Sequence, residues 1–169
     1  MQAGCRSGEM TSGMIKDTRF TGNTVAASSA AGDATAWAGA VLFNGSITNS
    51  VVRGNHVRAS SPNESASVAG GGLVQDDAAL MLRDTTVSEN TGDANGLTGT
   101  ARGGGIFDAA VPDGPPGGPL YLTNSRVTRN TLSGGASTTR QGGGVFPTEP
   151  VTLTNSVIAH NSPDQCSGC

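Results

Sequence analysis

The 169-residue sequence contains few of the residues that usually fill the core of a globular domain. Aromatic residues make up 4% of the chain and hydrophobic residues 35%. No stretch approaches the run of about eighteen apolar residues that a transmembrane helix requires, so we expect no membrane span. The first residues, Met1 to Arg6, also lack the apolar segment of a secretory signal. A folded chain of this composition requires an architecture with a narrow core.

Charged residues, histidines and cysteines are also sparse. The net charge is −3 and the arginines are scattered along the sequence without a basic stripe, so we expect no nucleic-acid partner. The two histidines, His56 and His160, belong to no recurring catalytic set and no metal-binding spacing. Cys5 stands alone, whereas Cys166 and Cys169 have C-x-x-C spacing without a second pair. We predict a disulfide between these two rather than a zinc site.

What the sequence has in abundance is repetition. An eleven-residue pattern, clearest at residues 120–130, occurs five times, and every copy closes with an asparagine. The closing residues are Asn23, Asn55, Asn90, Asn130 and Asn161. Eight positions earlier stand Ile15, Ile47, Leu82, Leu122 and Leu153. Three positions before the asparagine stand Phe20, Val52, Val87, Val127 and Ile158. Repeats of this length are typical of solenoids and propellers.

The pattern within each copy predicts strands rather than helices. Leu120 and Leu122 alternate with Tyr121 and Thr123, which is the period of a strand, and no copy shows apolar residues sustained at helical spacing. A glycine-rich segment that ends in large apolar residues precedes each of the last four copies, at 38–42, 70–74, 103–107 and 142–146. We therefore predict an all-β chain of about five turns with three short strands in each turn, wound as a parallel β-helix.

The polar columns support stacked turns. Six positions before the closing asparagine stand Asp17, Asn49, Asp84, Asn124 and Asn155, each followed by a serine or threonine. Identical asparagines at one corner of every turn can hydrogen-bond along the stack, so we predict an asparagine ladder at Asn23, Asn55, Asn90, Asn130 and Asn161. The column before these asparagines faces solvent, and it predicts an ion pair between Glu89 and Arg129 on adjacent turns.

These residues carry a resemblance to a known group of proteins. The Gly-Gly-Gly-Val/Ile-Phe element followed by Leu-Thr-Asn-Ser-x-Val-x-x-Asn resembles right-handed parallel β-helix repeats, which are pectate-lyase-like in fold and similar to polymorphic outer-membrane protein repeats in style. It covers residues 13–161 and implies a right-handed coil. We expect a single domain over 1–169, an excerpt of a longer exported protein that is secreted or lies on the cell surface. Neither end resembles a capping helix, so end-to-end self-association is possible.

Acidic residues recur near one corner of successive turns. They are Asp76, Asp77, Asp108 and Glu149, and stacking would bring them close enough to bind Ca²⁺ or to act as an acid and base pair. A Pro/Gly-rich insertion at 108–119 either walls a groove there or is a surface excursion. The resemblance implies aspartate clusters in hydrolases, and Ca²⁺ with an arginine base in lyases. The other motifs of those enzymes are missing.

Two functional interpretations follow. The first is a structural or adhesin-like β-helix with no catalytic residues and no cofactor, whose partner is a cell-surface glycan or protein. The second is a polysaccharide-active lyase or hydrolase, or a glycan-binding β-helix, with its groove near Asp76, Asp77 and Asp108 and with Ca²⁺ as a possible cofactor. The sequence favours the first interpretation because no catalytic motif accompanies the acidic residues.

Overall fold

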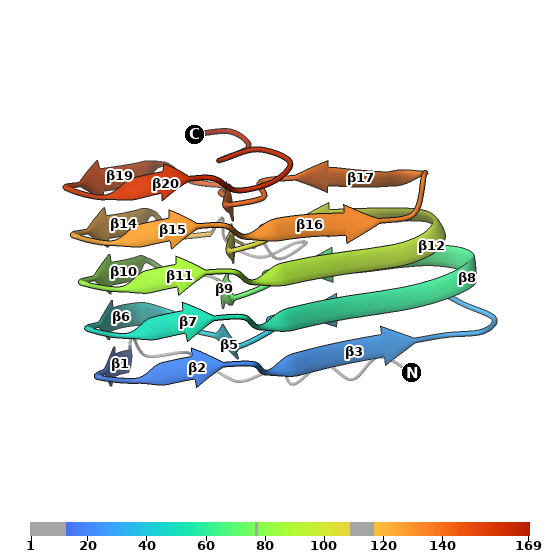
Figure 1. The fold of residues 1–169 in the computed structure, drawn as a ribbon, viewed down its shortest axis with the longest axis horizontal. Coiled ribbons are helices and arrows are strands. Elements are labelled where there is room, and N and C mark those ends of the chain that lie inside the picture. The colour runs from blue at the N-terminus through green and yellow to red at the C-terminus, as the bar shows by residue number, and fades with distance from the viewer. Residues whose placement is uncertain (1–12, 77, 109–116) are drawn as a thin grey trace.

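The protein is a parallel β-solenoid. The computed structural model describes residues 13–76, 78–108 and 117–169, and all the regular elements in these ranges are β-strands. Figure 1 shows the chain crossing the near face from left to right, returning behind, and rising by one level with each turn. This is a right-handed coil with the N-terminal turns at the bottom and the C-terminal turns at the top. The predicted all-β parallel β-helix is confirmed.

Four parallel sheets run along the coil, and sheets A and B contain the repeated eleven-residue pattern. Sheet A consists of β1 (Gly13–Lys16), β6 (Gly45–Thr48), β10 (Leu80–Arg83), β14 (Leu120–Thr123) and β19 (Val151–Thr154). Sheet B consists of β2 (Arg19–Thr21), β7 (Val51–Arg53), β11 (Thr86–Ser88), β15 (Arg126–Thr128) and β20 (Val157–Ala159). Equivalent residues of successive copies are in register, so that Ile47 lies between Ile15 and Leu82.

Sheet D contains the strands that the glycine-rich segments introduce. It consists of β5 (Val41–Leu42), β9 (Leu73–Gln75), β13 (Ile106–Asp108) and β18 (Val145–Phe146). Leu73 and Ile106 are aligned across adjacent turns, and both side chains are buried. Sheets A and B contain five strands and sheet D contains four. The described chain therefore completes between four and five turns.

A fourth sheet, which the prediction of three strands per turn does not include, closes each turn. Sheet C consists of β3 (Thr24–Ser28), β4 (Ala34–Trp37), β8 (His56–Ala69), β12 (Thr91–Arg102), β16 (Thr131–Gly134) and β17 (Thr138–Gln141). Residues 56–69 lie between the second copy of the repeat and the next glycine-rich segment, where the prediction of three strands per turn places no strand. These residues instead form one long strand that bends back at the end of the solenoid (Figure 1).

The core is divided between large and small side chains. Isoleucine, leucine and valine from sheets A, B and D fill one part, and each buried side chain of this size contributes about 1.5–3 kcal/mol to stability. The bent strands of sheet C enclose a second part lined mainly by alanine and valine. Its members are Ala34, Ala36, Val57, Ala59, Ala66, Val68, Ala94, Ala101 and Leu132. Small side chains suit this region because the chain folds back on itself there.

The glycine triplets are explained by backbone conformation and by close packing. The first glycine of each triplet has φ between +61° and +67°, a left-handed conformation that side chains disfavour; these are Gly70, Gly103 and Gly142. The third glycine lies against the asparagine column. A Cβ atom on Gly105 would lie 2.7 Å from the Gly144 oxygen and 2.8 Å from the Asn130 Nδ2 atom. Any side chain at this position would displace one of the two.

Candidate functional site

The closing asparagines form the predicted ladder. The Nδ2 atom of each asparagine donates to the Oδ1 atom of the next, with N–O distances of 2.9 Å for Asn55 to Asn90, 2.9 Å for Asn90 to Asn130 and 3.0 Å for Asn130 to Asn161. The backbone N–H of each asparagine donates to the same oxygen. Asn55, Asn90 and Asn130 are completely buried. The asparagine ladder of the sequence analysis is confirmed.

The inner ladder residues Asn55, Asn90 and Asn130 each join three successive turns. Asn90 donates its second Nδ2 hydrogen to the Val52 carbonyl of the preceding turn at 3.1 Å, and Asn130 donates in the same way to the Val87 carbonyl at 3.1 Å. An amide has two donors and one acceptor oxygen, which is the set that these three positions require. Serine or threonine could not replace asparagine here without leaving a buried group unpaired.

The hydroxyl residues form a second ladder that the sequence analysis does not predict. The backbone N–H of Thr85 donates to the Ser125 hydroxyl at 3.1 Å, and that of Ser125 donates to the Ser156 hydroxyl at 2.9 Å. The same hydroxyls donate to the carbonyl two residues earlier in their own turn, as Ser125 does to Thr123 at 2.8 Å. A hydroxyl can do both because it is donor and acceptor at once. The repeated Asp/Asn-Ser/Thr pair was the signal for this ladder.

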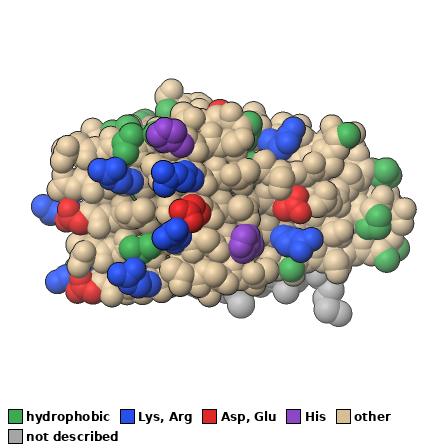
Figure 2. All heavy atoms as spheres, viewed as in Figure 1, with side chains coloured by type: hydrophobic (Ala, Val, Ile, Leu, Met, Phe, Trp, Pro, Cys, Tyr) green, Lys and Arg blue, Asp and Glu red, His purple; other side chains and the backbone are tan. Residues whose placement is uncertain are grey.

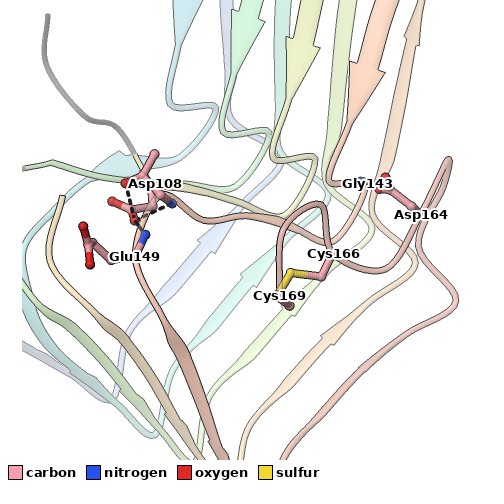
Figure 3. The surroundings of a disulfide bond; sticks show 7 residues. Asp108, Gly143, Glu149, Asp164, Cys166 and Cys169 are labelled. Carbon is pink, nitrogen blue, oxygen red and sulfur yellow. Dashed lines mark hydrogen bonds between the residues drawn. A yellow bond between two sulfur atoms is a disulfide. The ribbon is translucent and has the colours of Figure 1, made fainter. Parts of the chain in front are cut away.

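The C-terminal residues fold over the last turn and provide an acceptor at the end of the asparagine ladder. Gln165 Oε1 accepts from the Asn161 backbone N at 3.0 Å and from Asn161 Nδ2 at 3.2 Å. Asp164 Oδ1 accepts from the Gly143 backbone N at 2.7 Å (Figure 3). Residues 162–169, which we call the C-terminal tail, thus take the place of a further turn above sheets C and D.

A disulfide closes the C-terminal tail. Cys166 lies in a parallel bridge with Val145 and packs against the large-residue part of the core. It is bonded to Cys169, with 5.7 Å between the two Cα atoms (Figure 3). The disulfide therefore constrains the part of the C-terminal tail that follows Gln165.

At the acidic corner, Asp108 has a structural role. It is completely buried, and its Oδ2 atom accepts from the Thr148 backbone N at 2.9 Å, the Thr148 hydroxyl at 2.8 Å and the Glu149 backbone N at 3.2 Å. Figure 3 shows the Glu149 carboxylate beside Asp108. Asp76 lies on the preceding turn, where its backbone N donates to Asn44 Oδ1 at 2.9 Å. Asp77 lies outside the described residues. The structure thus brings Asp108 and Glu149 together.

Two oxygen atoms at this corner could contribute to holding a cation. Asp108 Oδ1 and Gln75 Oε1 are buried and have no hydrogen-bond partner among the described residues, and the two residues are aligned on adjacent strands of sheet D. Within the described ranges, no three His, Cys, Asp or Glu side chains are grouped as metal ligands would be. Ca²⁺ takes about six to eight oxygen ligands, so these two atoms form only part of such a site.

The structure also gathers basic side chains on one face, although the sequence shows no basic stripe. Figure 2 shows a group of Lys and Arg side chains on the near face, with acidic side chains beside some of them. In sheet B, Arg19, Arg53 and Arg126 flank the inward-facing residue of their strands and are exposed. They come from different turns, which is why the linear sequence does not show them as neighbours.

The ion pair predicted between Glu89 and Arg129 is wrong. Glu89 Oε2 instead accepts from Arg53, at 2.9 Å from Nη2 and 3.0 Å from Nε. Arg53 lies on the preceding turn and Arg129 on the following one. The pairing leaves Arg129 without an ion pair among the described residues.

Comparison with protein-family models, curated proteins and solved structures gives no match. The class of the protein therefore rests on its architecture. It is a parallel β-solenoid repeat protein, stabilised by a hydroxyl ladder and an asparagine ladder at two corners of each turn. In the ranges that the structure describes, no helix is long and apolar enough to cross a lipid bilayer.

Proposed function

We propose that this protein is a structural or adhesin-like β-solenoid of an exported bacterial protein, which is secreted or lies on the cell surface. The observation that carries the proposal is the asparagine ladder, which links all five closing residues through buried or half-buried hydrogen bonds. Ladders of this kind oppose bending and twisting between turns, which suits a rigid surface for display. The resemblance to pectate-lyase-like and outer-membrane repeats and the Cys166–Cys169 disulfide support an exported location.

The acidic corner supports catalysis poorly. Cleavage of a glycosidic bond by paired carboxyl groups requires both of them to reach the substrate. Asp108 is buried and its Oδ2 atom accepts three hydrogen bonds from the following turn, so it holds the chain in place. Glu149 is partly exposed and remains the one acidic side chain of this pair that a substrate could contact.

One observation favours the alternative, a glycan-binding or polysaccharide-active site. An open depression of about 450 Å³ adjoins Glu149, and Pro147, Thr148 and Cys169 also line it. A sugar bound there would meet the Glu149 carboxylate. This alternative predicts turnover or binding that depends on Glu149.

An assay for polysaccharide cleavage separates the two proposals. The protein is incubated with polygalacturonate and alginate, with and without Ca²⁺, and reducing ends and unsaturated products are measured. We expect no product and no rise in melting temperature with Ca²⁺. Product formation by the wild type that E149Q abolishes would overturn the structural proposal and establish the alternative. R83Q, an exposed substitution on sheet A, serves as the matched control.

A further inference from the structure

A positively charged surface lies on a protein whose net charge is negative. We call Arg19, Arg53, Arg126 and Arg129 the arginine face, since all four lie in or directly after strands of sheet B. Within the arginine face, Glu89 forms an ion pair with Arg53. The chain as a whole carries a net charge of −3. A positive surface on an acidic protein favours an anionic partner.

Three guanidinium groups of the arginine face are available to a ligand. Arg53 is held by Glu89, whereas Arg19, Arg126 and Arg129 form no ion pair among the described residues. Arg19 and Arg126 occupy one column of sheet B, separated by the turns that contribute Val51 and Thr86. With strands about 4.8 Å apart, they are roughly 14 Å from each other. This spacing suits an extended polymer better than a small ion.

A polar depression lies at one end of the arginine face. It has a volume of about 430 Å³, and Arg126 lines it together with Asn124 and Asn155, whose side chains are exposed. An arginine binds carboxylate or sulfate groups through paired hydrogen bonds. The two amides beside it can exchange hydrogen bonds with sugar hydroxyls. The depression therefore combines groups for an acidic substituent with groups for a sugar ring.

The face lacks what a single-stranded nucleic acid would use. Such strands bind through base stacking on aromatic side chains, in addition to electrostatic attraction. The aromatic residue of sheet B, Phe20, is packed against the core. The exposed aromatic side chains Trp37 and Tyr121 belong to sheets C and A. The arginine face thus offers charge and hydrogen bonds without a stacking surface.

We propose that the arginine face binds an anionic polysaccharide along sheet B, with Arg126 and Arg129 as its main contacts. The acidic substituent of the polymer is a carboxylate or a sulfate. This inference rests on the proposed function, because a display surface acts through what it binds. It concerns a different face from the acidic corner, so it requires neither Glu149 nor a metal ion.

Binding to immobilised heparin and immobilised alginate tests the inference, since one probe is sulfated and the other carboxylated. Neutral dextran is the reference surface. We expect R126Q/R129Q to raise the Kd about tenfold or more on the preferred probe. The control K16Q/R83Q removes the same charge from exposed residues of sheet A and is expected to change the Kd less than about twofold. Circular dichroism verifies that each variant is folded.

If R126Q/R129Q weakens binding and K16Q/R83Q does not, the inference is supported. The probe that the wild type binds more tightly then identifies the acidic group as sulfate or carboxylate. If both double variants lose the same affinity, binding depends on net charge alone and the inference is overturned. It is also overturned if the wild type binds neither heparin nor alginate. Competition by single-stranded DNA at equal charge concentration would also overturn it. Reducing ends measured in the same samples report on the proposed function separately.

Discussion

Replacing Asn90 by alanine is the most direct test of the asparagine ladder. The Asn90 side chain accepts from the Asn55 backbone N at 3.0 Å and from Asn55 Nδ2 at 2.9 Å. It donates to Val52 O at 3.1 Å and to Asn130 Oδ1 at 2.9 Å. Truncation therefore leaves two donors on Asn55 and one carbonyl on Val52 without partners, while Asn130 Oδ1 still accepts from the Asn90 backbone.

The cost follows from the number of orphaned groups. Each buried polar group that loses its partner costs about 1–3 kcal/mol, so three such groups cost about 3–9 kcal/mol. A water molecule entering the space left by the amide would restore part of this loss. We therefore expect N90A to reduce the free energy of unfolding by about 4 kcal/mol, a large share of the total of about 5–15 kcal/mol that is usual for proteins.

Urea unfolding followed by circular dichroism measures this change, and two variants control for it. N23A removes the exposed first residue of the ladder, whose side chain only donates to Asn55 Oδ1, and is expected to cost less than about 1 kcal/mol. N90D keeps the volume and the acceptor but loses the donors, so it is expected to be at least as destabilising as N90A. A loss in N90A no larger than that in N23A would refute the reasoning.

Three further substitutions test other parts of the structure. G105A places a Cβ atom against Gly144 O and Asn130 Nδ2 and is expected to cost about 1–3 kcal/mol in urea unfolding; an equal cost in G32A, where space is available, would contradict this. Q165A removes the acceptor of Asn161 and is expected to speed hydrogen exchange at the Asn161 amide about fivefold or more, whereas Q165E is expected to preserve protection. D108A orphans the Thr148 and Glu149 N–H groups and is expected to cost about 2–3 kcal/mol; a loss below about 0.5 kcal/mol would contradict a structural role for this carboxylate.

The repeated columns made the solenoid predictable. A residue that recurs at one position in every turn stacks on its own copies, so the asparagine column and the two apolar columns define a common corner and a common core. In-register pairs such as Val52 with Val87 follow directly from the aligned copies. These columns could be read because the eleven-residue pattern contains no insertion in any copy.

Sheet C could not be recognised in the same way. Its buried positions are mainly alanine and valine between polar residues, which gives a weak hydrophobic contrast along the sequence. The sequence from Ser60 to Asn63 is also typical of a turn. The strand is irregular there, as the shift in its register with β12 between Gly96 and Thr98 shows. Strand pairing with both neighbouring turns extends the strand through this bend and so overrides the local turn preference.

The residues of the acidic corner lie outside the eleven-residue copies, in segments whose length differs from turn to turn. Asp108 precedes an insertion in the fourth turn, and its partners Thr148 and Glu149 come from the following turn, about 40 residues later. Turn-to-turn spacing varies with each insertion, so the sequence alone does not predict which loop residues meet. The arginine face was hidden for a different reason, since its members lie in different copies and no single segment is basic.

Both buried ladders have one direction, and this explains the role of Gln165. In each column the backbone N–H donates to a side-chain oxygen of the next turn, as Asn130 does to Asn161 and Thr85 does to Ser125. The last turn therefore presents donors, and stability requires an acceptor above them. Gln165 follows the closing Asn161 by four residues, and its side-chain amide lies at the end of the asparagine column. There it accepts from the Asn161 N–H groups and donates to the Asn161 carbonyl. By the same rule, a turn stacked above sheet B would present an oxygen acceptor to the Ser156 backbone N–H.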